Sequence, residues 1–192
     1  MPGISGHFAF LPRPCQTILA ISGSLKRSSI NTAVLRASGL AATRDGIRVA
    51  VDDSVRELPH FSPDLEAEVP ESVVRFRKAC EDAVGVLLAV PEYTFGIPGS
   101  FKNALDWGVG SGSLYRKPIT VLKVSPPGRG AHVREMLDLA LKAHGAVVVH
   151  RSVPVSCRDL DERGEISNPR IVAELRSVVV ELATRAGPLD SA

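Results

Sequence analysis

The sequence predicts a doubly wound α/β domain whose five parallel strands lie in the order 2-1-3-4-5. Short apolar runs alternate along the chain with segments whose apolar residues recur at helical spacing, a pattern typical of parallel α/β folds. The run at 84–90 is almost wholly apolar, as a central parallel strand covered on both faces should be. With 192 residues, 44% of them hydrophobic, the chain suits one such domain. Because the crossovers between parallel strands are right-handed, this is one of the two common strand orders of doubly wound sheets.

The first elements follow from the pattern that begins at residue 16. Residues 16–21 are mostly apolar and rich in β-branched side chains, so they predict a first strand. Apolar side chains then recur at helical spacing over 29–43, and Gly46 ends that helix. The short run 47–51 predicts a second strand, and the prolines within 57–69 predict a loop.

The rest of the chain repeats this alternation. Val73, Phe76 and Cys80 have helical spacing and predict a helix that leads into the central strand at 84–90. The remaining predicted elements are a helix from 100 to 107, a strand at 118–124, a helix at 133–143, a strand at 147–149 and a helix at 169–185. Five strands alternating with helices complete the doubly wound sheet.

The expected domain covers residues 16–186. Residues 1–15 contain several prolines and no signal-peptide pattern, so they are expected to form a flexible leader, and 187–192 a tail. No apolar run approaches the length needed to cross a bilayer, which argues against a membrane protein.

The charge and the cysteines exclude several classes of protein. The formal charge of +2 arises from 23 basic and 21 acidic residues spread along the chain, which does not indicate a nucleic-acid or membrane-surface binder. Cys15, Cys80 and Cys157 are far apart and form no C-x-x-C pattern, so neither a disulfide framework nor a zinc site is predicted. We therefore expect a cytoplasmic protein.

Three loops carry the unusual residues, and parallel strands would bring all three to one edge of the sheet. In the first loop, Ser24, Ser29 and Asn31, with Lys26 or Arg27, precede or open a helix whose free N–H groups favour an anion. A phosphate monoester fits this set. The alternative is that Ser28 or Ser29 only caps the helix.

Other catalytic and nucleotide motifs are missing from the sequence. Gly23 has no glycine partner at the spacing of a Walker loop or of the G-x-G-x-x-G fingerprint, so Asp52 and Asp53 after the second strand are interpreted as structural. There is no G-x-S-x-G or H-E-x-x-H motif. Three separate histidines, His132, His144 and His150, are expected to be surface or helix residues, so no metal ligands are predicted.

The second loop, 91–98, follows the central strand and is stiffened by two prolines. Its backbone groups suit the polar edge of a flavin ring, and Tyr93 and Phe95 are candidates for apolar cover; alternatively, both pack against neighbouring helices. The third loop, 125–130, contains two glycines that permit close backbone approach to the other side of a ring. A plain strand-to-helix turn is equally compatible with it.

Residues 23–31 (GSLKRSSIN) and 91–107 (PEYTFGIPGSFKNALDW) resemble the NADPH-dependent FMN reductases. This flavodoxin-like group includes quinone, azo-dye and chromate reductases. The resemblance covers roughly residues 17–182, and the second motif is long enough to be far more specific than a lone glycine pattern.

The resemblance implies which residues bind FMN. Ser24, Lys26, Ser29 and Asn31 would surround the phosphate. The implied ring contacts are Pro91, Glu92, Tyr93, Thr94 and Gly96 on one side and Ser125, Pro126 and Gly128 on the other. Three features depart from the family pattern: Lys26 replaces the usual Arg, which removes a bidentate donor, Thr94 replaces the usual Asn, and the third loop is shorter in glycine.

The implied function is that of an NAD(P)H-dependent FMN oxidoreductase. NADPH or NADH would pass a hydride to N5 of FMN, and a quinone, azo compound, metal oxyanion or free flavin would take the electrons. Because the flavin carries the chemistry, no catalytic side chain is required. The alternative is a flavodoxin-type electron carrier that binds FMN without oxidising NADPH, although such carriers usually present an acidic docking surface. A scaffold protein with a vestigial flavin pocket is a third interpretation.

The resemblance also implies a homodimer or homotetramer. Leu105 and Trp107 are candidates for a subunit contact, and intramolecular packing explains them as well. In a dimer, the loop at 108–115 and residues of the second subunit would border the flavin.

Overall fold

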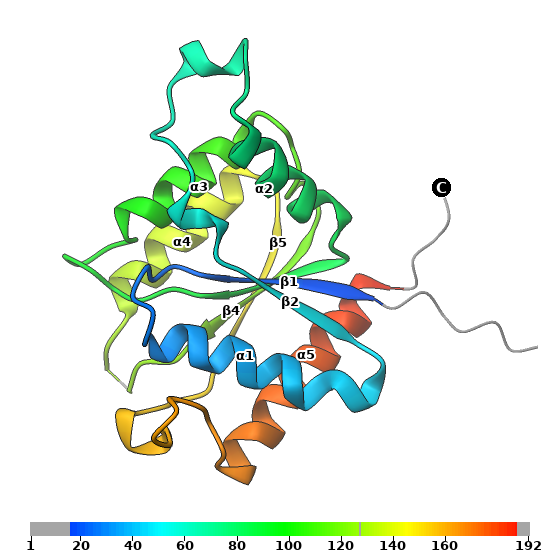
Figure 1. The fold of residues 1–192 in the computed structure, drawn as a ribbon, viewed down its shortest axis with the longest axis vertical. Helices are drawn as coiled ribbons and strands as arrows, with labels where there is room; N and C mark the ends of the chain where they lie inside the picture. Colours follow the sequence, from blue (N-terminus) through cyan, green and yellow to red (C-terminus); the bar gives the residue numbers. More distant parts are fainter. Residues whose placement is uncertain (1–15, 127, 188–192) are drawn as a thin grey trace, which may run out of the picture.

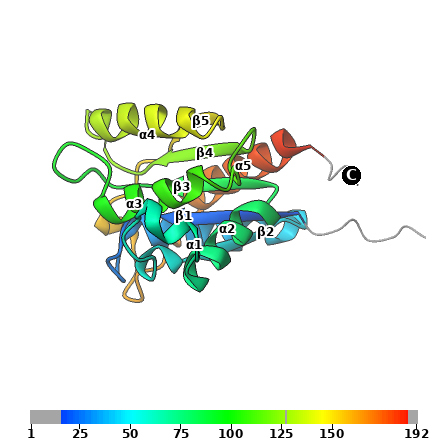
Figure 2. The same cartoon turned by 90° about the horizontal axis from the view of Figure 1, so that it is seen from above.

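Five parallel strands form one sheet in the order β2-β1-β3-β4-β5, as the sequence predicts. The computed structural model describes residues 16–126 and 128–187. The predicted leader at 1–15 and residues 188–192 of the predicted tail lie outside the described residues. The strands are β1 (Thr17–Ser22), β2 (Arg48–Asp52), β3 (Gly85–Ala89), β4 (Pro118–Lys123) and β5 (Val147–Ser152). Figure 2 shows them side by side, with β3 in the middle of the sheet.

Helices cover both faces of the sheet (Figure 1). On one face lie α1 (Ile30–Ala42) and α5 (Pro169–Ala186), which pack against each other. On the other face lie α2 (Glu71–Asp82), α3 (Gly99–Val109) and α4 (Ala131–Ala143). The helices α1, α4 and α5 begin and end within two residues of their predicted bounds, α3 begins one residue before its predicted start, and α2 includes the residues whose spacing predicted it. Among the described residues, none of the helices is long and apolar enough to span a membrane.

Each face of the sheet has its own hydrophobic core, because successive strand residues point to opposite sides. Ile18, Leu87 and Leu122 face α1 and α5. Their neighbours Leu19 and Leu88 face the opposite helices. Every residue of β3 is buried, which explains why the central strand had the clearest signal in the sequence.

The strand β5 is longer than predicted, because it continues through His150, Arg151 and Ser152 instead of ending at Val149. It is an edge strand, and its polar side chains are held by the flanking helices. His150 Nε2 lies 2.6 Å from Asp138 Oδ1 of α4, and Arg151 Nε donates to Glu181 Oε2 of α5 at 2.9 Å. The apolar run at 147–149 therefore marks only the first half of the strand, and its polar second half has no such signal.

Leu105 and Trp107 pack inside the subunit, so the interpretation as a subunit contact is wrong for both. Trp107 is fully buried and Leu105 is 5% exposed. The indole Nε1 of Trp107 donates to the carbonyl oxygen of Pro59 at 2.8 Å, and the ring of Phe61 meets it edge to face at 5.0 Å. These contacts attach the 57–69 loop to α3. Trp107, at the end of the 91–107 motif, therefore stabilises the fold.

Candidate functional site

The loops that follow β1, β3 and β4 lie at one edge of the sheet. Ser22 pairs with Ala89 in the parallel register, and Ala89 with Leu122. The first loop is tied directly to the central strand, since the Gly23 amide donates to the carbonyl oxygen of Ala89 at 2.9 Å. A Cβ atom at Gly23 would lie 2.7 Å from Val90 Cγ1, so only glycine permits this close approach.

A hollow of about 760 Å³ lies between these loops and the start of α4, a size common for small-molecule sites. Six predicted cofactor residues line it, namely Asn31, Pro91, Glu92, Ser125, Pro126 and Gly128. We call this cavity the main hollow. The structure therefore brings the three predicted loops to one cavity, while flavin binding in it stays a prediction.

The N-terminus of α1 is open toward this edge. Ser29 occupies the N-cap position and is buried, yet its side chain makes no capping hydrogen bond. The first backbone N–H groups of the helix therefore have no side-chain acceptor there. Ser24 is also buried, and its Oγ lies 3.4 Å from Tyr93 Oη, which joins the first loop to the second. The capping alternative fails for Ser29, because the expected bond is not formed.

The N-terminus of α4, by contrast, already holds a carboxylate. Glu92 Oε2 accepts a hydrogen bond from the backbone N–H of Val133 at 3.1 Å and lies 3.8 Å from His132 Nδ1. A negative side chain at this position satisfies the helix dipole. The α4 end is thus occupied by a carboxylate of the chain itself, whereas the α1 end beside the main hollow has no side-chain cap.

The second loop forms a tight hairpin at Tyr93–Gly96. Two backbone hydrogen bonds close it, from Tyr93 N to Gly96 O at 3.1 Å and from Gly96 N to Tyr93 O at 2.9 Å. Its central residues Thr94 and Phe95 have φ values of 50° and 58°, a region that costs a non-glycine residue about 1–2 kcal/mol. Both are exposed: Phe95 is not buried, although its ring contacts His132 at the start of α4, and Thr94 lies at the turn tip without lining the main hollow.

The third loop combines both predicted features, a turn and a close backbone approach. Gly128 and Gly130 have φ values of 80° and 82°. Ser125 Oγ donates to the carbonyl oxygen of Arg129 at 3.3 Å and closes the turn. A Cβ atom at Gly130 would lie 2.9 Å from this hydroxyl, so glycine is required where α4 begins.

A second, smaller hollow of about 560 Å³ lies on the other side of the first loop, between β1 and β2. Ser24 and Lys26 line this hollow instead of the main one. The predicted phosphate shell is thus divided: Asn31 faces the main hollow, Lys26 faces the second, and Ser29 lies between them at the helix start. We expect the loop itself, with its backbone N–H groups, to be the centre of the phosphate site.

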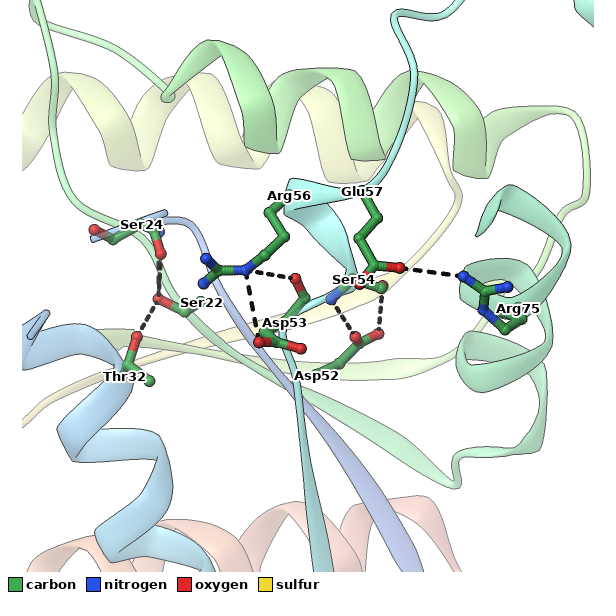
Figure 3. A network of polar contacts seen from close by, with 9 residues as sticks. All are labelled: Ser22, Ser24, Thr32, Asp52, Asp53, Ser54, Arg56, Glu57 and Arg75. Carbon is green, nitrogen blue, oxygen red and sulfur yellow. Dashed lines mark hydrogen bonds and ion pairs between the residues drawn. The ribbon is translucent and has the colours of Figure 1, made fainter. Parts of the chain in front are cut away.

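Polar contacts beside the second hollow hold its acidic residues in place (Figure 3). Asp52 Oδ1 accepts from the Ser54 backbone N–H at 2.7 Å, and Asp53 lies 3.5 Å from Arg56 Nε. Both carboxylates therefore stabilise the turn after β2, in agreement with the prediction that they have a structural role. Thr32 Oγ1 donates to Ser22 Oγ at 3.0 Å and ties α1 to the end of β1.

The three histidines occupy different environments. His132 is exposed as predicted, but it lines the main hollow, a role that the sequence analysis missed. His144 is buried at the end of α4, where burial lowers the pKa of its imidazole, so the surface prediction is wrong for it. His150 is a half-buried strand residue, which neither predicted role describes. The position of His132, two residues after the third loop, was the available signal.

The chain is similar in sequence to known flavin-dependent and quinone reductases. Residues 16–159 match the protein family described as "NADPH-dependent FMN reductase". A rice protein (Oryza sativa subsp. japonica) named "Probable NADPH:quinone oxidoreductase 2" is 29% identical over 176 residues, which cover 86% of each chain. A quinone reductase of Pseudomonas putida is 35% identical over 119 residues, 59% of this chain and 62% of that protein.

Solved structures share the fold. FerB from Paracoccus denitrificans, a flavoenzyme NAD(P)H:(acceptor) oxidoreductase, superposes with a TM-score of 0.74 at 27% identity, covering 89% of this chain and 97% of that one. An archaeal flavodoxin superposes with a TM-score of 0.57 at 10% identity, covering 89% and 99% of the two chains, which supports the flavodoxin-like fold alone.

Proposed function

Because the chain belongs to the NADPH-dependent FMN reductase family, we propose that it binds FMN across the three loops and transfers electrons from NAD(P)H to a small quinone-type acceptor. The observation that carries this proposal is the open N-terminus of α1 beside the main hollow. A helix end with free N–H groups suits a phosphate, and the adjoining hollow suits a flat ring.

The residues present fit both ends of FMN. The phosphate would be held by the backbone at the start of α1, with hydroxyls from Ser24 and Ser29, the Asn31 amide and the Lys26 ammonium group. Pro91 and Glu92 from the second loop and Ser125, Pro126 and Gly128 from the third line the main hollow and are the proposed ring contacts, with Tyr93, Thr94 and Gly96 in the hairpin beside them. Gly96 offers backbone only, because a Cβ atom there would lie 2.6 Å from Met136 Sδ.

The protein supplies binding and orientation. The hydride transfer from a reduced nicotinamide and the delivery of two electrons to the acceptor would be the chemistry that bound FMN supplies. Glu92 holds the second loop against α4 through the Val133 N–H, so its carboxylate oxygen is engaged in positioning the loop. The Ser24–Tyr93 contact holds the same loop against the phosphate-binding turn. No side chain is assigned a proton-transfer step.

The acceptor class follows from the relatives. A quinone is the acceptor named for the rice and Pseudomonas putida proteins, and we extend it to this chain. An azo compound, a metal oxyanion or free flavin would use the same open edge. We also propose a cytoplasmic homodimer or homotetramer, in keeping with the free Cys80 and Cys157 thiols and with the family resemblance.

A titration that compares FMN with riboflavin tests the two-ended site. Riboflavin has the same ring but lacks the phosphate, so we expect FMN to bind about 100-fold more tightly, the effect of one or two charge-assisted hydrogen bonds. Quenching of flavin fluorescence on binding gives both dissociation constants. Equal affinities would mean that the α1 end takes no phosphate, and failure of both flavins to bind would overturn the proposed function.

A further inference from the structure

Phe95 combines two properties that the fold does not require. Its φ of 58° lies in the left-handed region, where glycine or asparagine is normally found in a two-residue hairpin turn. Its large apolar side chain is 73% exposed. Glycine would satisfy the backbone and remove the exposed ring. Strain of this kind persists mainly where it serves a function.

The ring of Phe95 is held at the mouth of the main hollow. It meets the imidazole of His132 edge to face, with ring centroids 5.2 Å apart and an interplanar angle of 72°. Both residues line the hollow. The hairpin cannot easily shift, because Glu92 is bonded to the start of α4 and Gly96 lies against Met136. Thr94 and Arg116 also have positive φ values, but neither lines this hollow.

We propose that Phe95 and His132 form an aromatic wall that packs against a flat aromatic electron acceptor and thereby determines acceptor choice. This inference rests on the proposed function and adds to it the residues that select the acceptor. A quinone ring can pair with both rings of the wall, whereas a small inorganic acceptor such as ferricyanide offers no surface for such packing.

The test uses the FMN-loaded protein with menadione and ferricyanide as acceptors and NADPH as donor. In Phe95→Gly, the ratio of kcat/KM for menadione to that for ferricyanide is expected to fall about five- to tenfold, the range of an aromatic pair in a binding site. Phe95→Tyr keeps the ring and should retain the wild-type ratio. Arg116→Gly is the matched control, because it removes a positive-φ side chain at the opposite end of β4 and should also leave the ratio unchanged.

Thermal unfolding and size-exclusion chromatography provide readouts that do not depend on turnover. Phe95→Gly should unfold at the wild-type temperature or above it, and menadione should raise the unfolding midpoint less than in wild type. In Phe95→Gly, an unchanged ratio of kcat/KM for menadione to that for ferricyanide, a lower unfolding midpoint or an altered oligomeric state would contradict the proposal. If wild type oxidises no NADPH with either acceptor, the proposed function fails. The inference is then still tested by whether menadione raises the unfolding midpoint of Phe95→Gly less than that of wild type.

Discussion

Replacing Ser29 by aspartate is expected to weaken FMN binding at least about 100-fold without destabilising the apoprotein. The carboxylate would stand at the open end of α1, where a like charge about 4 Å from the phosphate costs several kcal/mol at an effective dielectric constant of about 20. The same carboxylate is a good N-cap and interacts favourably with the helix dipole, by about 0.5–1 kcal/mol. Opposite effects on binding and stability would distinguish a phosphate site from a helix cap.

Two further variants control this experiment. Ser28→Asp adds the same charge at the adjacent, exposed position, and FMN affinity should change by less than about fivefold. Ser29→Ala should leave the free energy of unfolding within about 0.5 kcal/mol of wild type, because the hydroxyl makes no capping bond. FMN titration and urea unfolding of each variant supply the numbers. Wild-type affinity in Ser29→Asp would place the phosphate elsewhere.

Replacing Trp107 by alanine is expected to lower the free energy of unfolding by about 3–5 kcal/mol. The indole is fully buried, donates a hydrogen bond to Pro59 and contacts the Phe61 ring. The guanidinium carbon of Arg77 also lies 5.7 Å from the ring centroid. Removing the side chain leaves a large cavity, while the Pro59 carbonyl oxygen keeps the hydrogen bond from Asn103 Nδ2 at 2.9 Å.

Val109→Ala is the matched control for Trp107→Ala, since Val109 lies on the same helix but is 54% exposed. Its effect should stay within about 0.5 kcal/mol. Urea unfolding with sedimentation analysis separates the two interpretations of Trp107. A loss below about 1 kcal/mol accompanied by subunit dissociation would restore the interface interpretation that the structure contradicts.

The apolar pattern predicted the fold well because the three inner strands, β1, β3 and β4, are buried between the two layers of helices. The central strand at 84–90 could be recognised from burial on both faces, and its neighbours from their length and spacing. The exception is β5, where His150 and Arg151 extend the strand beyond its apolar residues. Partners on α4 and α5 hold these polar side chains, and such long-range pairs leave no local pattern.

The site was predictable in its location and not in its internal geometry. Parallel strands had to bring the three loops together, so Asn31, Pro91 and Ser125 could be expected at one edge. The bond from Val133 to Glu92 joins residues 41 positions apart, and nothing in either segment indicates it. Thr94 and Phe95 give no sequence signal for positive φ, because the left-handed turn is imposed by the hairpin that the surrounding loop forms.

The central claim, that this chain oxidises a nicotinamide at a bound flavin, is tested most directly by adding NADPH to the FMN-loaded protein in the absence of oxygen. The account predicts that NADPH alone bleaches the visible flavin absorbance and that menadione restores it over repeated cycles. An absorbance that NADPH leaves unchanged, although a chemical reductant bleaches it, would contradict the account and would identify a flavodoxin-type electron carrier.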